Sequence, residues 1–292
     1  MERIAKLVVV GVGLIGGSFA LALKRAKAVG RVVGVGRSAS NIYRAQELKI
    51  IDAEGAFDRE TFGDADLVLL AMPVGQMLGV MRAIAPFLGD RTVVTDAGST
   101  KQDVVELARR ELKKSLARFV PGHPIAGTEK SGAGAAFPEL YRRRKVVLTP
   151  LKGTDRHALA RVRAAWEACG ASVLVLAPRE HDAVLATVSH LPHVLAFALV
   201  DQVARSRDAK RLFSYAAGGF RDFTRIASSS PEMWRDICMA NRKALLAEIE
   251  RYGRGLERVR KMLERGDAKG LEALFAGARD ARDRWVRDRP MT

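Results

Sequence analysis

The feature that most constrains the fold is a glycine turn between an apolar run and a helical stretch near the start of the chain. Lys6 to Val10 is a β-branched run, typical of a strand buried on both faces. Gly11-Val12-Gly13-Leu14-Ile15-Gly16 follows at once, and Ser18 to Arg25 has a helical pattern. A strand, GxGxxG and a helix in this order form the context that a dinucleotide-binding fingerprint requires. We therefore expect this turn to hold a pyrophosphate at the helix N-terminus.

The alternation of strands and helices continues through the first 177 residues. Further strands are predicted at Arg31 to Val35, Asp66 to Ala71, Thr92 to Thr95, Phe119 to Pro121, Lys145 to Thr149 and Ser172 to Leu176. Helices are predicted between them at Asn41 to Leu48, Gln76 to Phe87, Lys101 to Lys113 and Asp155 to Ala168. This order indicates an α/β domain with a doubly wound parallel sheet. After Pro178 only helical patterns follow, so we expect a sheet domain at 1–177 and a helical domain at 178–292.

Polar and glycine-rich segments follow the carboxyl ends of the predicted strands, where ligands lie in sheets of this kind. They are Met72-Pro73, Asp96 to Thr100, and the stretch Phe119 to Gly134. The last has the glycines and prolines of an irregular loop, and it carries the imidazole of His123 and the carboxylate of Glu129. A loop with such groups is where α/β enzymes place their chemistry, although a plain surface loop would also keep a solvated histidine.

Two places stand out in the helical half. In Ser189 to His193, Pro192 is expected to break or restart the helix, and His190 and His193 would share one helical face. This pair lacks a carboxylate or cysteine partner at helix spacing, so no metal site is predicted, and one imidazole could instead cap a helix or lie in the core. Gly218 to Arg225 is expected to form a turn that presents guanidinium groups to a carboxylate, or else an ordinary ion pair with Asp222.

Composition excludes several classes of protein. The net charge is +16, but aromatic residues make up 6% of the 292 residues and no basic stripe is interleaved with them, so a nucleic-acid partner is not expected. Leu7 to Leu23 is uncharged, yet its four glycines suit the nucleotide turn better than a membrane span, and no other segment was expected to cross a bilayer. Cys169 and Cys238 have no CxxC spacing, which fits a reducing cytoplasm. The apolar content of Leu191 to Val203 predicts a homodimer.

Taken together, these stretches resemble the prephenate/arogenate (cyclohexadienyl) dehydrogenase family of tyrosine biosynthesis over nearly the whole chain. The motifs that carry the resemblance are GVGLIGGS at Gly11 to Ser18, DAGSTK at Asp96 to Lys101, GHPIAGTEKSG at Gly122 to Gly132, SHLPH at Ser189 to His193, GGFRDFTRIA at Gly218 to Ala227 and PEMWRD at Pro231 to Asp236. The resemblance implies a Rossmann domain followed by an all-helical dimerisation domain. It also implies oxidative decarboxylation of prephenate or arogenate, with hydride transfer to a nicotinamide cofactor.

The family pattern assigns expected roles to particular residues. His123 matches the base that takes the hydroxyl proton of the substrate, and Ser99 matches a residue that hydrogen-bonds the same hydroxyl. Arg225 matches the residue that holds a substrate carboxylate. The remaining matches are His193 near the substrate side chain, and Glu129, Asp182 and Trp234 lining or gating the site. Since neither a regulatory nor a mutase domain is expected, inhibition by tyrosine would act at the active site.

The cofactor preference is predicted from the end of the second strand. NAD-binding domains usually place a carboxylate there to accept from the ribose hydroxyl. In this chain Gly36 occupies the position and Arg37, Ser38 and Ser40 follow, which favours NADP. Alternatively, Arg37 stacks on the adenine and both NADP and NAD are used.

Two other kinds of function compete with this interpretation. A β-hydroxyacid dehydrogenase would resemble its relatives in using a lysine on the first helix of the helical domain, and no lysine lies between Arg179 and Arg205. A non-enzymatic cofactor-sensing protein would not need His123, Ser99 and Arg225 together.

Overall fold

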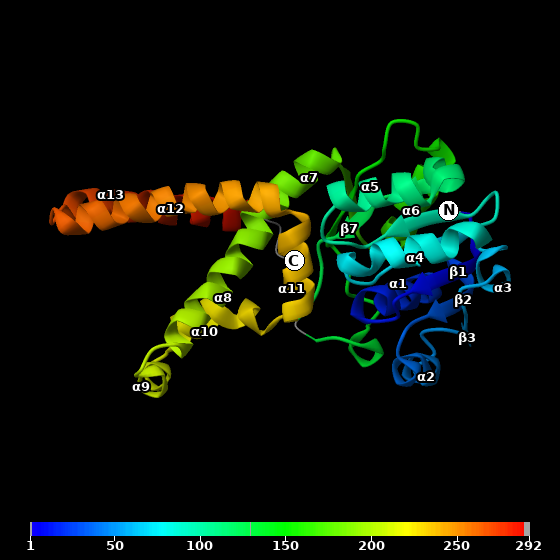
Figure 1. Cartoon of the computed structure of the whole chain (residues 1–292), viewed down its shortest axis with the longest axis horizontal. Helices are drawn as coiled ribbons and strands as arrows, with labels where there is room; N and C mark the ends of the chain where they lie inside the picture. The colour runs from blue at the N-terminus through cyan, green and yellow to red at the C-terminus, as the bar shows by residue number, and fades with distance from the viewer. Residues whose placement is uncertain (1, 129, 289–292) are drawn as a thin grey trace. The chain divides into compact units, whose positions relative to one another are not determined.

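A computed structural model describes residues 2–128 and 130–288, and the chain divides into two compact units, Met1–Asn241 and Arg242–Thr292. The first unit contains a six-stranded sheet in the order β3-β2-β1-β4-β5-β6, with every neighbouring pair parallel (Figure 1). Its strands are β1 Ile4–Val10, β2 Val29–Val35, β3 Ala53–Glu54, β4 Leu67–Leu70, β5 Val93–Asp96 and β6 Phe119–Val120. The predicted doubly wound parallel sheet is confirmed.

Helices cover both faces of this sheet, and alternate residues of a strand pack against opposite faces. Leu7 and Val9 of β1 belong to one buried apolar cluster, which includes residues of α1 Leu14–Arg25, α2 Ala39–Glu47 and α6 Arg156–Ala168. Val8 and Val10 belong to a second cluster with residues of α3 Arg59–Phe62, α4 Met77–Ile84 and α5 Gln102–Glu111. Each fully buried valine or leucine stabilises the fold by about 1.5–3 kcal/mol, so the two-sided burial of β1 fixes the centre of the sheet.

A second, three-stranded sheet corrects two expectations. Strands β8 Lys145–Leu148 and β9 Ser172–Val175 do not join the main sheet; they pair with each other in parallel, and β8 pairs antiparallel with β7 Gly122–Pro124. His123 therefore lies on a strand, opposite Val147, and not in an irregular loop. Pro124 is tolerated because β7 is an edge strand, where a missing N–H is not needed.

The helical part of the first unit is more continuous than the sequence predicted. Helix α7 Pro178–Leu185 passes through a π-helical turn, Ala186–His190, into α8 Leu191–Ala204. Pro192 does not break it, because the wider π-turn accommodates a proline in the first turn of α8. The helices that follow are α9 Ala209–Ser214, α10 Gly218–Thr224 and α11 Pro231–Ala240. Gly218 to Arg225, expected as a turn, is therefore mostly the helix α10.

The continuity of α7 and α8 also corrects the expectation about membrane spans. Within the described part of the chain, the stretch Pro178–Ala204 is long and apolar enough to cross a membrane by length and composition alone. Core helices of soluble proteins pass the same test, so the finding is weak evidence for a membrane protein.

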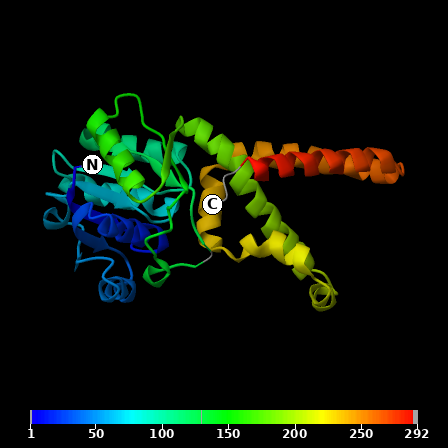
Figure 2. The same cartoon turned by 180° about the vertical axis from the view of Figure 1, so that it is seen from behind.

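The second unit is a pair of helices that lie side by side, α12 Arg242–Glu264 and α13 Ala268–Arg287 (Figures 1 and 2). Gly266, with a φ of +64°, lies in the connection, and the Asp267 side chain caps α13 by accepting from the Gly270 N–H at 2.8 Å. No strand follows Val175 among residues 176–288, as the sequence predicted. The domain boundary at 177/178 stays a prediction.

Candidate active site

The predicted nucleotide turn is built almost entirely from backbone. Gly11 has a φ of +94°, and a Cβ there would lie 2.5 Å from the carbonyl oxygen of Ala71, so only glycine fits. A Cβ at Gly16 would lie 2.4 Å from the Gly11 oxygen, which shows how closely α1 packs on the turn. Gly13, by contrast, has no neighbouring atom within 4 Å of such a Cβ and begins α1 without a side-chain cap. The open space and the uncapped N–H groups of Leu14 and Ile15 fit a pyrophosphate.

The neighbouring strand ends supply the rest of the predicted nucleotide site. Met72 and Pro73 follow β4, and the exposed residues Gly36, Arg37 and Ser38 follow β2. Ser38 accepts from the Asn41 N–H at 3.3 Å, and its Oγ lies 2.9 Å from the Oγ of Ser40. The Arg37 side chain has no hydrogen bond or ion pair to any residue in 2–128 or 130–288. A guanidinium beside two hydroxyls is suited to an additional phosphate.

A cavity of about 670 Å³ lies next to the strand of His123. His193 on α8, Arg225 after α10 and Trp234 on α11 line it together with His123. The rings of His193 and Trp234 are stacked, with centroids 3.7 Å apart, so each holds the other in position. Four of the predicted site residues are therefore brought to one cavity from four separate elements.

Two of the other residues predicted for the substrate site, Ser99 and Asp182, do not line this cavity. Ser99 is half-buried in the segment between β5 and α5 and does not line this cavity. Glu129 lies outside the described residues. Asp182 was expected to line or gate the site, but it is buried and is not at the cavity wall. Its carboxylate contacts the backbone of Lys101 and Gln102 and the ring of His181.

Asp96, at the end of β5, connects the segments that carry Ser99 and His123. One carboxylate oxygen accepts from the Gly98 N–H at 2.8 Å, and the other accepts from the Gly122 N–H at 3.1 Å. The same carboxylate forms an ion pair with Lys101, and both side chains are fully buried. These hydrogen bonds fix the segments of Ser99 and His123 to the carboxyl end of β5. Loss of either charge would leave the other buried and uncompensated, so both members of the ion pair are needed.

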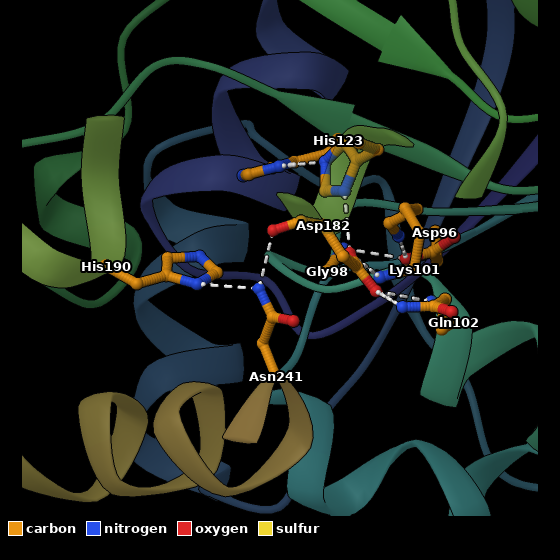
Figure 3. A network of polar contacts seen from close by, with 9 residues as sticks. Asp96, Gly98, Lys101, Gln102, His123, Asp182, His190 and Asn241 are labelled. Carbon is orange, nitrogen blue, oxygen red and sulfur yellow. Dashed lines mark hydrogen bonds and ion pairs between the residues drawn. The ribbon is translucent and has the colours of Figure 1, made fainter. Parts of the chain in front are cut away.

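A second chain of hydrogen bonds leads from α5 to His123 (Figure 3). Asp182 accepts from the backbone N–H groups of Lys101 at 2.8 Å and Gln102 at 2.9 Å. It also lies 2.8 Å from Nδ1 of His181, and Nε2 of His181 lies 2.8 Å from Nδ1 of His123. Because a carboxylate only accepts, we infer that His181 donates from Nδ1 and accepts at Nε2. His123 then carries its proton on Nδ1, and its Nε2 is left as a base.

The electrostatics of this chain keep His123 neutral. Burial, together with the charges of His181, Lys101 and His190, holds the pKa of His123 well below its usual value. Burial opposes ionisation of Asp182, but hydrogen bonds from His181 and from the Gln102 and Lys101 backbone outweigh it and lower the pKa of Asp182. At neutral pH the arrangement is a carboxylate, a neutral His181 and a neutral His123, as a general base requires.

The two histidines of the π-turn region have different surroundings. His190 is buried, its Nδ1 lies 3.1 Å from the Asn241 side-chain nitrogen, and burial lowers its pKa to about 4. Asn241 also donates to the backbone oxygen of Asp182 at 2.8 Å. His193 has its Nδ1 2.8 Å from the Ser189 carbonyl oxygen, and its ring lines the cavity. One imidazole is thus a core residue and the other belongs to the site.

Sequence reasoning gave no role to Asp96, Lys101, His181 and Asn241. A charged residue at the end of the apolar run Thr92 to Thr95 was a usable signal, because an acid in that place needs a buried partner. The role of His181 had no such signal, because its partner His123 lies 58 residues away in the chain.

The fold and the site define a class of protein. A nucleotide turn at the carboxyl end of a central parallel strand, together with a neutral imidazole on a cavity, is typical of a dinucleotide-dependent oxidoreductase. Two family models match the chain: prephenate dehydrogenase, nucleotide-binding domain, over residues 19–175, and prephenate dehydrogenase, dimerization domain, over residues 177–277. The chain belongs to the prephenate dehydrogenase family.

Similar proteins extend over most of its length. The prephenate dehydrogenase of Bacillus subtilis (strain 168) is 38% identical over 279 residues, which cover 95% of this chain and 75% of that protein. The cyclohexadienyl dehydrogenase of Zymomonas mobilis is 35% identical, with 94% of each chain covered. The crystal structure of prephenate dehydrogenase from A. aeolicus in complex with hydroxyphenyl propionate and NAD+ is 36% identical, has a TM-score of 0.91 and covers 97% of this chain and 98% of its own. The protein is thus an oxidoreductase with a nicotinamide cofactor and a dimerisation domain.

Proposed function

We propose that the protein oxidises and decarboxylates prephenate, with His123 as the base, Arg225 as the carboxylate-binding residue and NADP as the favoured cofactor. The observation that carries this proposal is the hydrogen-bonded chain Asp182–His181–His123, which leaves Nε2 of His123 unprotonated on the wall of the cavity that Arg225 also lines.

The chemistry requires few groups from the protein. Nε2 of His123 takes the proton of the ring hydroxyl. A nicotinamide cofactor held at the glycine turn would supply the acceptor for the hydride that leaves the carbon bearing this hydroxyl. The bond to the ring carboxylate then breaks, its electron pair enters the ring, and carbon dioxide leaves. The ring becomes a phenolate, which recovers the proton from His123. Because the His123 pKa is low, the imidazolium that forms is a strong enough acid to return this proton.

The remaining residues position the substrate. Arg225 is suited to hold a carboxylate through two parallel hydrogen bonds. The stacked rings of His193 and Trp234 line the same cavity, and an aromatic ring there is suited to contact a six-membered ring of the substrate. Ser99 is proposed to contact the ring hydroxyl from its place after Gly98, which Asp96 ties to the strand of His123. Asp182 is proposed to orient the base, and Glu129, which lies outside the described residues, is proposed to line or gate the site.

The cofactor preference is proposed from the end of β2. Gly36 supplies no carboxylate to repel a 2′-phosphate, and Arg37 with the hydroxyls of Ser38 and Ser40 can bind one. NAD would lack this phosphate and gain nothing from Arg37. Gly11, Gly13 and Gly16, with Leu14 and Ile15, would hold the pyrophosphate, and Met72 and Pro73 would border the nicotinamide half.

The assembly and setting follow from the family. A homodimer through the helical half is proposed because the dimerization model covers residues 177–277. Tyrosine shares a carboxylate and a phenol ring with the aromatised product, so any inhibition by tyrosine is proposed to be competitive with prephenate at this cavity. A cytoplasmic location is proposed, with no membrane or nucleic-acid partner.

The test is an assay with prephenate and arogenate, each with NADP and NAD, followed by the near-ultraviolet absorbance of the reduced nicotinamide. Reduction with prephenate, together with a hydroxyphenyl product, is the expected result. Absence of reduction in all four combinations would refute the proposed function. A β-hydroxyacid dehydrogenase would instead reduce the cofactor with simple hydroxy acids, and no lysine for that chemistry lines the described part of the cavity.

A further inference from the structure

Three consecutive arginines, Arg142 to Arg144, occupy a turn that the proposed mechanism does not use. The turn is held by backbone bonds from the Arg143 N–H to the Gly170 oxygen at 2.8 Å and from the Arg144 N–H to the Tyr141 oxygen at 2.9 Å. Tyr141 is fully buried and donates its hydroxyl to the Ile15 oxygen at 2.6 Å, which anchors the turn to α1. The turn is therefore part of the rigid framework.

The conformation of this turn separates the three side chains. Arg143 has a φ of +59°, a left-handed conformation that costs a non-glycine residue roughly 1–3 kcal/mol and persists only where the surroundings impose it. On either side of it, Arg142 and Arg144 both line the cavity of His123, whereas Arg143 does not. The reversal at Arg143 thus places two arginines on the wall of the same cavity.

Neither of these guanidinium groups is neutralised by the part of the chain that the structure describes. In residues 2–128 and 130–288, neither Arg142 nor Arg144 has a side-chain hydrogen bond or an ion pair. Glu139 is the one acid that lines the cavity in this part of the chain, and it is already in an ion pair with Arg25. Arg142 and Arg144 therefore add two positive charges to the described wall, which suits a ligand with more than one negative charge.

The register of β7 and β8 relates the position of Arg144 to that of His123, the proposed base. His123 lies opposite Val147, and the Ile125 N–H bonds to the Lys145 oxygen at 2.8 Å. Arg144 is three residues from Val147, a distance of roughly 10 Å along an extended strand. Prephenate has its hydroxyl at one end of the ring and both carboxylates at the other. A substrate with its hydroxyl at His123 would therefore direct its carboxylates away from the base.

We propose that Arg142 and Arg144 are specificity-determining residues that favour prephenate over arogenate. This inference rests on the proposed function and adds the substrate preference to it. Prephenate carries two negative charges and no positive one. Arogenate carries an ammonium group beside its side-chain carboxylate, so the two guanidinium groups repel part of the molecule that they would otherwise attract. The arginines act through binding and association and take no part in proton or hydride transfer.

The test compares two double variants that each remove two positive charges from the same segment. The first is Arg142→Gln with Arg144→Gln, at the cavity. The matched control is Arg143→Gln with Lys145→Gln, whose side chains do not line the cavity. For parent and variants, kcat and kcat/KM are measured with both substrates at low and high salt. Circular dichroism and the melting temperature check folding, which these exposed side chains should not change.

The parent is expected to prefer prephenate. The cavity variant is expected to lose about 10- to 100-fold in kcat/KM for prephenate, much less for arogenate, and to show a weaker salt dependence. Its kcat should stay close to that of the parent, and the control variant should change by less than about threefold. A parent that prefers arogenate overturns the inference, as does an equal loss for both substrates or an equal loss in the control. If the parent oxidises neither substrate, the proposed function itself fails. If the parent oxidises prephenate but the cavity variant keeps the parent's ratio of kcat/KM for prephenate over arogenate, this inference alone fails.

Discussion

The nucleotide turn and the cavity beside it are built in opposite ways. The turn uses six consecutive residues, and its shape depends on side chains that are missing, since added atoms at Gly11 or Gly16 would overlap backbone oxygens. The cavity uses side chains that are present, drawn from β7, α8 and α11 and from the turn after α10. A site formed by the backbone of consecutive residues can be recognised as a sequence motif. A site formed by side chains from distant segments depends on how those segments pack together.

The two sites also hold charge differently. At the turn, the partial charge of uncapped N–H groups needs no counterion. In the network that holds His123, by contrast, full charges are buried and compensated, as in Asp96 with Lys101 and Asp182 with the start of α5. We expect changes at the cavity to have large effects on turnover, and changes at the turn to alter cofactor choice.

The largest effect is expected from His123→Asn. Asparagine keeps a polar group in place but cannot accept the hydroxyl proton, so turnover should fall by about 10²- to 10⁴-fold. Cofactor affinity, measured by fluorescence titration, should be unchanged because the turn is intact. His157→Asn is a suitable control, since His157 is exposed on α6. Near-full turnover in His123→Asn would remove His123 from the role of base.

Arg225→Ala is expected to act on substrate binding. Loss of a charge-assisted hydrogen bond costs about 2–3 kcal/mol, which corresponds to a roughly 30- to 150-fold rise in the KM for prephenate. Arg221→Ala, one turn earlier on α10 and away from the cavity, should leave KM unchanged. If both variants give the parent's KM in folded protein, Arg225 has a structural role and the cavity binds its substrate differently.

The same contrast explains which parts could be predicted from the sequence. The main strands and the turn were predictable because their signals are local: apolar runs and glycines in order. Placing His123 in a loop was wrong because its strand forms only against β8, whose pairing residue Val147 lies in a different part of the chain. Asp182 could be singled out, but its true contacts, to Lys101 and Gln102, are 81 and 80 residues away. Such contacts are set by tertiary packing, which leaves no repeating pattern of residues in the sequence.

Acid should destabilise the protein through the buried imidazoles around the cavity. Burial lowers the pKa of His190 from an ordinary 6.5 to about 4, and the pKa values of His123, His181 and His193 are lowered as well. Below pH 6.5 the histidines of the unfolded chain bind protons, whereas the buried histidines of the folded protein stay neutral. The free energy of unfolding therefore decreases as the pH falls toward 4. Protonated His190 would also present a hydrogen to the Asn241 amide, which already donates to its Nδ1.

The measurement is the urea midpoint at a series of pH values in that window. In His190→Gln the loss on acidification should be smaller than in the parent, whereas His157→Gln, an exposed position, should follow the parent. A midpoint in the parent that stays level across the window would contradict the proposed burial of neutral histidines.

The smallest effect is expected at the end of β2, where Gly36→Asp tests whether the missing carboxylate sets the cofactor choice. A Cβ at Gly36 would lie 3.0 Å from the tip of the Ile42 side chain, which can shift, so the variant should fold. The new charge would repel a 2′-phosphate and accept from a ribose hydroxyl, and the ratio of kcat/KM for NADP over NAD should fall by about tenfold or more. Gly36→Asn, which has the same size without the charge, should change the ratio far less. The proposal fails if the parent clearly prefers NAD, if Gly36→Asp leaves the ratio unchanged, or if the asparagine variant shifts it equally, because in that last case bulk and not charge would decide the preference.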